Sequence, residues 1–278
     1  TILDRLEQHR VKYAFFVPAV IMFLNSVPAV RDRDFSNLEL ILYGASPISE
    51  EVLLTATEIF KCQFCQVYGL TETAGAGTFL EHQDHDPARG KLRSCGKPVA
   101  TAEVRILGHN GEDMPANAVG EILYRSGTLM KGYWKNDQAT TKAVQDGWFY
   151  TGDAGYLDEE GYLFIHDRIK DMIVSGGENV YPAEVENALF GLAEIADVAV
   201  IGVPDTKWGE AVKAVVVLKP GETASEQEII DFAKTKIAGY KVPKSVDFTD
   251  ALPRNPTGKL LKRELRAPYW DNQERQIN

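Results

Sequence analysis

The sequence predicts an α/β protein with three parts: a mostly parallel sheet with helices, an antiparallel β unit and a small α+β domain. Helical segments alternate with short apolar segments up to about residue 80, which is typical of a buried parallel sheet. Between about 95 and 167, short alternating segments are separated by Gly, Asn and Asp turns, which indicates antiparallel strands. The mixed pattern that follows is long enough for a domain that folds by itself. We therefore expect parts at 1–94, 95–169 and 170–278, the first two forming one large domain.

The apolar segments of the first part predict parallel strands whose carboxyl ends share one edge of the sheet. We expect strands at Tyr13–Val17, Leu38–Tyr43 and Phe64–Tyr68 and helices at Ala19–Ser26 and Ser49–Phe60. Ligands of such sheets bind at the carboxyl ends of the strands. The segments Gly44–Ser46 and Gly69–Thr73 follow two of these ends and are therefore candidate ligand-binding turns.

The second and third parts are predicted from shorter patterns. Strands are expected at Ala102–Leu107, Gly120–Arg125 and Tyr162–His166, with turns at His109–Gly111 and Asp158–Gly161. In the third part we expect helices at Ala183–Phe190 and Ser225–Ile237 and strands at Val198–Val203 and Val212–Leu218.

The composition limits the class of protein. With 44% hydrophobic and 25% charged residues, the 278 residues can bury a sizeable core. The net charge of −10 argues against nucleic acid as a partner, because a protein that binds phosphate backbones needs a basic surface. The longest apolar run, Tyr13–Val20, is too short for a transmembrane segment, contains Pro18 and is interpreted as a buried strand. Three cysteines are too few for a disulfide scaffold, so we expect a reducing compartment, the cytoplasm.

Two groups of residues look like metal sites but are interpreted otherwise. Cys62 and Cys65 form a CxxC pair without a second pair or a nearby His, so we expect buried strand cysteines. The other group is interpreted as a solvated polar loop and consists of His82, Asp84, His85 and Asp86.

The first motif with chemistry follows the third predicted strand, in Gln66–Thr73. Tyr68 offers an aromatic face for a purine, and Gly69 lets another backbone approach closely. Thr71 can donate a hydrogen bond to a phosphate oxygen, and Glu72 supplies the hard oxygen that Mg²⁺ prefers. The alternative interpretation is a strand followed by a turn with a helix cap.

Two further motifs are weaker by themselves. In Thr151-Gly152-Asp153, a carboxylate after a Thr-Gly turn can accept hydrogen bonds from two ribose hydroxyls, although the same tripeptide is an ordinary turn. Gly176 and Gly177 follow an apolar strand, which suits either a tight hairpin or a narrow channel for a thin ligand arm.

The fourth motif is Pro253–Lys259. Two prolines and a glycine hold such a loop in one conformation and place Lys259 at its end. A lysine placed in this way can neutralise the charge that develops on a transferring phosphoryl and carboxylate group. The alternative is a solvated surface lysine.

In this order and spacing, the four motifs resemble the ANL superfamily of adenylate-forming enzymes: acyl-CoA synthetases, firefly-type luciferases and nonribosomal-peptide adenylation domains. The resemblance covers essentially the whole chain. Asp167–Ile173, Ser175–Asn179 and Lys207–Glu210 look most like fatty-acyl-CoA ligases. The resemblance implies a large AMP-binding domain, here truncated, followed by a small mobile domain.

The resemblance also implies roles for individual residues. Those expected at the nucleotide are Gly44, Ala45 and Ser46 beside the adenine, Tyr68 stacked on it, Gly69 next to Tyr68, Thr71 and Asn179 at the phosphate, and Asp153 and Arg168 at the ribose. The expected catalytic residues are Thr71, Glu72, which would bind Mg²⁺, and Lys259, the adenylation lysine. Elsewhere, Lys170 would be the hinge between domains, Gly176 and Gly177 would line the pantetheine passage, and Gly75, Ala76 and Gly77 would border the acyl group.

The reaction that the resemblance implies has two steps and uses ATP, Mg²⁺ and coenzyme A. A carboxylic acid, expected to be a medium- or long-chain fatty acid, attacks the α-phosphate and gives acyl-AMP and pyrophosphate, with Lys259 neutralising the developing charge. The small domain then rotates about Lys170, and the coenzyme A thiol attacks the acyl-AMP. Because the residues at 75–77 are small, we expect Gly77→Trp to shift the preference toward short acids.

One departure from the family concerns the phosphates. The phosphate loop, a Ser/Thr- and Gly-rich stretch that ends in Pro-Lys-Gly, and the aromatic or His gate after it do not occur in this sequence. The chain also opens at Thr1 as an amphipathic helix without an initiator Met. We therefore expect a carboxyl-terminal fragment that is inactive by itself and whose partners include its own amino-terminal portion. A homodimer is also allowed.

Two alternatives stay open. The enzyme could be an adenylation domain that loads a carrier protein, although such chains usually continue into a carrier module. The chain could instead be a non-catalytic piece that binds a nucleotide or coenzyme A. A thioester assay that compares coenzyme A with a carrier protein tests the first alternative. Calorimetry with AMP and coenzyme A, together with ATP–pyrophosphate exchange by the isolated chain, tests the second.

Overall fold

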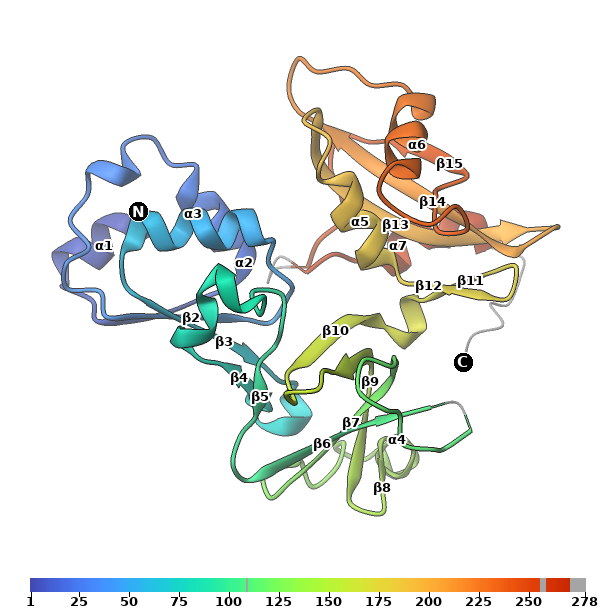
Figure 1. Cartoon of the computed structure of the whole chain (residues 1–278), viewed down its shortest axis with the longest axis horizontal. Helices are drawn as coiled ribbons and strands as arrows, with labels where there is room; N and C mark the ends of the chain where they lie inside the picture. The colour runs from blue at the N-terminus through green and yellow to red at the C-terminus, as the bar shows by residue number, and fades with distance from the viewer. Residues whose placement is uncertain (109, 256–258, 271–278) are drawn as a thin grey trace. The chain divides into compact units, whose positions relative to one another are not determined.

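The computed structural model describes residues 1–108, 110–255 and 259–270 (Figure 1). His109 of the predicted turn and residues 256–258 of the predicted lysine loop lie outside the described residues. The chain divides into two compact units, Thr1–Ile165 (unit 1) and His166–Asn278 (unit 2). The sequence places its boundary a few residues later, at Lys170, and the hinge role of that residue stays a prediction.

Unit 1 begins with a five-stranded sheet in the order β1-β2-β3-β4-β5. Its strands are β1 (Tyr13–Phe16), β2 (Leu40–Gly44), β3 (Gln63–Tyr68), β4 (Thr78–Leu80) and β5 (Lys97–Pro98). The helices of this part are α1 (Ile2–Gln8), α2 (Pro18–Asn25) and α3 (Glu50–Phe60). β1, β2 and β3 run parallel, and β4 and β5 each run antiparallel to the preceding strand. The predicted α/β class is confirmed.

Side chains at the helix ends explain where α1 and α3 begin and end. Thr1 caps α1, and its side chain and that of Asp4 satisfy each other's backbone N–H groups in a capping box. Ser49 accepts a hydrogen bond from the Val52 backbone at the start of α3, which ends at Lys61 in the left-handed conformation, with φ 50°. Within the described ranges, none of the helices combines the length and apolarity that a bilayer span requires.

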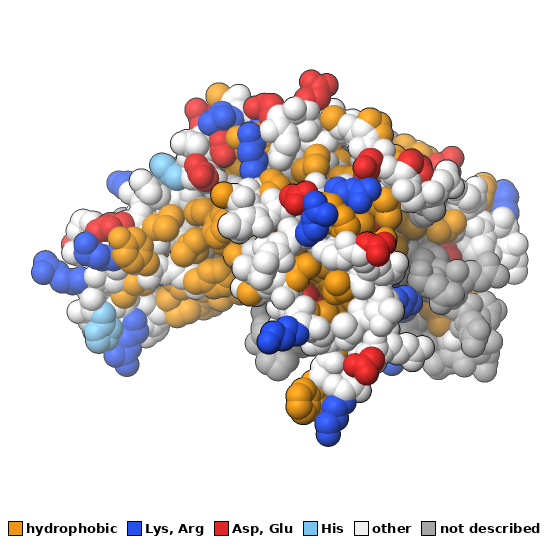
Figure 2. Space-filling view, turned by 90° about the horizontal axis from the view of Figure 1, so that it is seen from below, with side chains coloured by type: hydrophobic (Ala, Val, Ile, Leu, Met, Phe, Trp, Pro, Cys, Tyr) orange, Lys and Arg blue, Asp and Glu red, His pale blue; other side chains and the backbone are white. Residues whose placement is uncertain are grey.

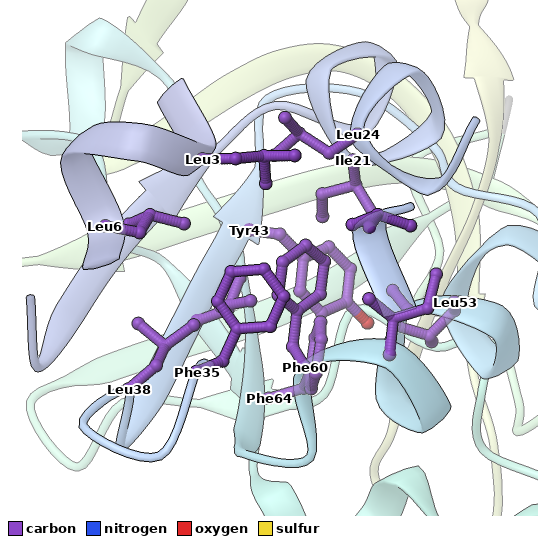
Figure 3. Packing of buried hydrophobic residues seen from close by; sticks show 14 of the residues in the cluster. Leu3, Leu6, Ile21, Leu24, Phe35, Leu38, Tyr43, Leu53, Phe60 and Phe64 are labelled. Atoms are coloured by element: carbon purple, nitrogen blue, oxygen red, sulfur yellow. The ribbon is translucent and has the colours of Figure 1, made fainter. Parts of the chain in front are cut away.

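The hydrophobic core of this part packs β2 and β3 against the helices (Figure 3). Tyr43 and Phe64 are fully buried on the two neighbouring strands, and Phe60 of α3 is 1% exposed. The rings of Phe35 and Phe60 pack with their centroids 4.9 Å apart. Burying one such side chain stabilises a fold by about 1.5–3 kcal/mol relative to leaving it exposed. This packing therefore fixes the two strands whose carboxyl ends carry the candidate turns.

β1 departs from the prediction of a buried strand. It is the first strand in the order of its sheet, and its side chains alternate between exposed and half-buried. Tyr13 is 62% exposed and Phe15 is 56% exposed, and on α2 Phe23 is 64% exposed. Figure 2 shows hydrophobic side chains gathered on the side where Figure 1 places α1, β1 and α2. Only the first half of the apolar run thus forms a strand, Tyr13–Phe16, and this strand has one exposed face; Pro18–Val20 already belong to α2.

The rest of unit 1 contains the predicted antiparallel β unit. Its strands are β6 (Ala102–Leu107), β7 (Gly120–Ser126), β8 (Val144–Gln145), β9 (Trp148–Leu157) and β10 (Leu163–Arg168), and its helix is α4 (Asp137–Ala143). The sheet has the order β10-β9-β7-β6, and β8 pairs with β9. β6, β7 and β9 pair antiparallel, which is the predicted kind of sheet, although β9 is not among the predicted strands. β10 extends across the boundary into unit 2.

Unit 2 is a small α+β fold, as predicted. Its strands are β11 (Ile173–Ser175), β12 (Glu178–Val180), β13 (Ile195–Asp205), β14 (Gly209–Leu218) and β15 (Ser245–Phe248). Its helices are α5 (Pro182–Leu189), α6 (Glu226–Lys234) and α7 (Lys262–Trp270). The sheet has the order β12-β11-β14-β13, with β15 beside β14. Val200 and Val212 of the long β13–β14 pair are fully buried with Val185 of α5 and Ile229 of α6, which holds both helices on the sheet.

Candidate functional site

The carboxyl ends of β2 and β3 meet at one edge of the sheet, where the first two candidate turns begin. Gly44 pairs with Val67, and a Cβ at Gly44 would lie 2.1 Å from the Val67 carbonyl oxygen. A Cβ at Gly69 would lie 2.5 Å from the carbonyl carbon of Gly75. Both positions therefore require glycine because another backbone passes directly against them.

Ala45 and Ser46 follow Gly44 at this edge and are exposed. Ala45 has φ 70°, a left-handed conformation that is uncommon for a residue other than glycine. Such strain often accompanies a backbone that is shaped for a ligand. The structure thus places Gly44–Ser46 beside the end of β3, where the adenine is predicted to lie.

Tyr68 and Asp153, predicted to bind adenine and ribose, lie in contact. The Tyr68 hydroxyl donates a hydrogen bond of 2.8 Å to Asp153 Oδ2. Burial, and then the charge of Asp153, raise the pKa of Tyr68 well above its ordinary value, so this hydroxyl stays protonated and remains a donor. Two residues 85 positions apart in sequence are therefore brought together at the edge that Gly44 and Gly69 form.

Asp153 does not lie in a turn, which corrects one interpretation of the Thr-Gly-Asp tripeptide. These residues form an irregularity within β9, where the pairing with β7 shifts between Glu121 and Leu123. Gly152 has φ 68°, and its N–H donates to Glu121 Oε1 at 3.1 Å. Thr151 Oγ1 donates to the Ile122 carbonyl at 2.7 Å. A bulge of this kind redirects a side chain, and here the redirected side chain is Asp153.

Glu72 lies in a short 3-10 helix, Thr71–Thr73, with Thr71 exposed. The Tyr133 hydroxyl donates to Glu72 Oε1 at 2.8 Å, and Met130 N–H donates to the Glu72 carbonyl at 2.8 Å. Burial, and then the hydrogen bond to Glu72, raise the pKa of Tyr133 to about 12, so Tyr133 remains a donor. A carboxylate with one oxygen fixed suits Mg²⁺, which takes one or two protein carboxylates and phosphate oxygens.

Sequence reasoning missed both Tyr133 and Glu121, which orient predicted site residues. Each acts through a partner distant in sequence: Tyr133 is 61 positions from Glu72, and Glu121 is 31 from Gly152. Tyr133 follows Gly132 in a loop, so no strand or helix periodicity marks it. Burial raises the pKa of Glu121 and the charge of Asp153 adds to this, while the hydrogen bond from Gly152 N–H acts against it.

The predicted acyl segment Gly75–Gly77 is packed less openly than its small residues suggest. Gly75 has φ 84° and open space where a Cβ would be. A Cβ at the buried Gly77 would lie 3.2 Å from Tyr124 Cε2, and the Tyr124 hydroxyl donates to the Ala76 carbonyl at 3.3 Å. The side of Gly77 that a side chain would occupy is therefore filled by Tyr124, and a tryptophan there would have to displace that ring.

In unit 2, Gly176 and Gly177 form the turn of a hairpin, which was one of their two interpretations. β11 and β12 pair Ser175 with Glu178, and the glycines have φ 63° and 87°. Gly176 N–H donates to the Trp208 carbonyl at 2.8 Å, and a Cβ at Gly176 would lie 2.7 Å from Trp208 Cε3. Asn179 follows on β12, opposite Val174. The pantetheine and phosphate roles of these residues stay predictions.

Lys259 is exposed and directly precedes Leu260, which forms an isolated β-bridge ahead of α7. Its N–H donates to Asn255 Oδ1 at 2.8 Å, and its carbonyl accepts from Asn255 N–H at 2.9 Å. Arg254 and Leu260 form an isolated β-bridge, and Arg254 pairs with Asp197 at 2.7 Å. These contacts hold the backbone on both sides of the undescribed part of the loop.

Arg168 ends β10, and Lys170 lies in a 3-10 helix, Ile169–Asp171. The Lys170 side chain is exposed, and its carbonyl accepts a hydrogen bond from Arg266 of α7 at 3.4 Å. The ribose and hinge roles of these two residues stay predictions.

The loop around His85 departs from the prediction of solvated polar residues. Asp84 is 4% exposed and His85 is 6% exposed. The hydroxyl of the buried Tyr43 lies 2.9 Å from His85 Nε2, and the Tyr162 hydroxyl donates to Asp84 Oδ1 at 3.0 Å. These two side chains are buried with polar partners that satisfy them: Tyr43 of β2 for His85, and Tyr162 together with Arg89, whose Nη1 lies 2.9 Å from Oδ1, for Asp84. In the described part of the chain, no three His, Cys, Asp or Glu side chains are grouped as metal ligands.

The cysteines are free thiols and only partly fit the expected strand positions. Cys65 lies in β3 and Cys62 directly before it, and both are half-buried rather than buried. Burial raises the pKa of both thiols, that of Cys62 to about 11. Both therefore behave as small hydrophobic side chains and not as reactive thiolates.

Two family models match the chain. The model described as AMP-binding enzyme matches residues 1–134, and the model described as AMP-binding enzyme C-terminal domain matches residues 184–259. The first contains Tyr68 and Glu72, and the second contains Lys259.

Similar proteins align with nearly the whole chain. The chain is 40% identical over 276 residues to the fatty acid–acyl-carrier-protein ligase ScoC of Streptomyces coeruleorubidus. The aligned part includes 99% of this chain and 53% of ScoC. The chain is 42% identical over 262 residues to the long-chain-fatty-acid–CoA ligase FadD13 of Mycobacterium tuberculosis (94% of this chain, 51% of that protein). The crystal structure of ATP-bound MatB from Rhodopseudomonas palustris has a TM-score of 0.89 at 31% identity (98% of this chain, 53% of that chain). The chain thus spans about half the length of the relatives that it matches.

Proposed function

The chain belongs to the AMP-binding enzymes of the ANL superfamily of adenylate-forming enzymes, and from this premise we propose that it is part of an acid–thiol ligase. The proposed ligase activates a carboxylic acid with ATP and transfers the acyl group to a thiol. The observation that carries the proposal is the contact between Tyr68 and Asp153 at an edge built from the backbones of Gly44 and Gly69. This arrangement offers an aromatic ring, a carboxylate and close-packed main chain to one ligand.

For nucleotide binding, each part of the edge has a proposed role. Glycine backbone at 44 and 69 lets the flat adenine approach closely, and Tyr68 supplies the ring face. The bulge at Gly152 aims Asp153 at the ribose hydroxyls, for which a carboxylate is a good acceptor. Glu72, oriented by Tyr133, would hold Mg²⁺, which draws charge from the phosphate oxygens.

The proposed reaction has two displacements. In the first, a carboxylate oxygen of the acid forms a bond to the α-phosphorus, and pyrophosphate leaves. Lys259 is proposed to stabilise the negative charge that develops in this step. In the second, the thiol sulfur forms a bond to the acyl carbon, the thiol proton is lost to solvent, and AMP leaves.

We propose a fatty acid as the substrate class, on the likeness to FadD13 and ScoC. The test is ATP–pyrophosphate exchange by the gene product that contains this chain, with acids of increasing chain length. Exchange that depends on a fatty acid and is lost in Lys259→Ala supports the proposal. Exchange that no carboxylic acid stimulates would refute it. The chain by itself is proposed to bind AMP without exchange, since it has no phosphate loop.

A carrier protein is the second candidate acceptor, because ScoC, which aligns with 99% of this chain, is named for that activity. The two acceptors are separated by supplying the acyl-AMP with either coenzyme A or a phosphopantetheinylated carrier protein. Formation of the coenzyme A thioester alone supports the first candidate, and acylation of the carrier alone supports the second.

A further inference from the structure

Helix α7 presents two cations to buried carboxylates of unit 2. Lys262 Nζ lies 2.9 Å from Glu186 Oε1 of α5 and 3.6 Å from Asp167 Oδ2. The three side chains are only 11%, 15% and 10% exposed. Burial by itself lowers the pKa of Lys262, but the charges of Glu186 and Asp167 outweigh it and raise the pKa, so the lysine is a cation at this position.

One helical turn further along α7, Arg266 binds the segment Ile169–Asp171. Arg266 Nη1 lies 2.8 Å from Asp171 Oδ1, with side chains 14% and 13% exposed, and it donates to the Lys170 carbonyl at 3.4 Å. Residues four apart lie on the same face of a helix. One face of α7 therefore contacts this segment through Arg266, and Asp167 and Glu186 through Lys262.

The same helix is connected to the candidate lysine. α7 starts three residues after Lys259, and Leu261 N–H donates to the Pro253 carbonyl at 2.9 Å, which closes the loop onto the helix start. At the other end, Trp270 Nε1 donates to the Gly202 carbonyl of β13 at 3.0 Å. Any change in the orientation of α7 against its sheet therefore moves the backbone that carries Lys259.

We propose that Asp171 and Arg266 are positioning residues for Lys259, because their ion pair makes α7 and the lysine follow the segment Ile169–Asp171. The inference rests on the proposed function, in which Lys259 serves the adenylation step and Lys170 lies at the hinge. The pair then has a role beyond stability, because it makes the hinge segment Ile169–Asp171 and helix α7, which adjoins Lys259, move together.

The pair is suited to a test because Lys262 holds α7 independently of it. Asp171→Asn and Arg266→Gln remove the charge pair, and Arg266→Lys keeps the charge but replaces the planar guanidinium, whose Nη1 reaches both Asp171 and the Lys170 carbonyl. The matched control is Asp231→Asn, which removes an ion pair with Lys234 on α6 whose side chains are 56% and 55% exposed.

Two measurements test the proposal. In the gene product that contains this chain, we expect Asp171→Asn and Arg266→Gln to slow acyl-AMP formation about tenfold, as for a displaced catalytic group. Thioester formation from supplied acyl-AMP should change less than about twofold, because Lys259 has no part in it. Arg266→Lys should restore part of the first rate. Equal loss in both half-reactions would mean a merely structural pair and would overturn the proposal.

The second measurement is hydrogen exchange on the chain itself. Amide protection at 169–171 and at 262–270 should fall together in Asp171→Asn and stay unchanged in Asp231→Asn. Unchanged protection in Asp171→Asn would overturn the mechanical link whatever the kinetics show. If the unsubstituted gene product forms no acyl-AMP, the proposed function fails, and exchange still decides whether the link exists.

Discussion

The buried cation of α7 allows a stability prediction that follows directly from the geometry. Lys262→Met preserves most of the apolar stem and removes the charge that faces Glu186 and Asp167. Both carboxylates then stay buried without the positive charge that Lys262 supplies. Backbone donors remain for both: Val200 N–H donates to Glu186 Oε1 at 2.7 Å, and Asp167 accepts from Ala183 N–H at 2.9 Å and from Arg168 N–H at 2.7 Å.

The expected loss is about 3 kcal/mol in the free energy of unfolding of unit 2. Removing one partner of a buried ion pair usually costs about 3–5 kcal/mol, and the remaining backbone donors favour the lower end. The matched control is Lys234→Met, whose pair with Asp231 is solvated, and its effect should lie within the error of the measurement.

The pH dependence provides an internal check. Burial raises the pKa of Glu186, and the charge of Lys262 acts against this, so Lys262→Met moves the pKa further up. A carboxyl with a raised pKa binds protons more readily in the folded state than in the unfolded state, where its pKa is about 4.3. Stability then falls as pH rises between these two pKa values. The deficit of Lys262→Met should therefore be smaller at pH 5 than at pH 7.

The assay is urea unfolding of the chain, with β13 and β14 followed by hydrogen exchange so that unit 2 is measured by itself. Equal effects of Lys262→Met and Lys234→Met would refute the reasoning. A deficit that grows on acidification would refute the assignment to Glu186.

Three further predictions concern unit 1. Gly44→Ala should cost about 1–3 kcal/mol by forcing the neighbouring strand away, whereas Gly127→Ala, in open space, should be neutral; thermal unfolding compares them. Tyr133→Phe should raise the Mg²⁺ concentration needed for half-maximal exchange, because Glu72 loses its orienting donor, and an unchanged magnesium curve would contradict this. Burial lowers the pKa of His85, so on acidification the unfolded state binds a proton before the folded state does. Below about pH 6.5, the free energy of unfolding of unit 1 should therefore fall by up to roughly 1.4 kcal/mol per pH unit. His85→Gln should reduce this slope, measured by urea unfolding at a series of pH values.

The elements were predictable where a local pattern marks them. The apolar runs around Leu42 and Phe64 form parallel strands close to the expected bounds because their side chains fill one core. Ser49 with its following acidic residues marks the start of α3, and the Gly176–Gly177 pair marks a hairpin, since both signals depend only on neighbouring residues. The predicted roles of the site residues are a separate matter and await the experiments above.

The features that the sequence did not reveal depend on partners far along the chain. Gly152 looks like a turn residue, and only the pairing of β9 with β7 makes it part of a bulge. Asp84 and His85 look solvated, but tyrosines 78 and 42 positions away bury them. The same holds for Tyr133, which no periodicity connects with Glu72. Local polarity therefore misleads wherever a tertiary hydrogen bond satisfies the polar atom.

The main-chain edge at Gly44 and Gly69 determines which positions near the candidate site can be varied by mutation and which must be kept. No side chain can be introduced at either position without shifting a neighbouring backbone, so at these two positions the edge presents only main chain. Variation is tolerated best at the exposed Ser46 and, with Tyr124 changed in concert, at Gly77, whereas Ala45 is restricted by its left-handed backbone. A mutant library that keeps the two glycines and randomises these tolerant positions would explore new substrates while leaving the shape of the shared edge intact.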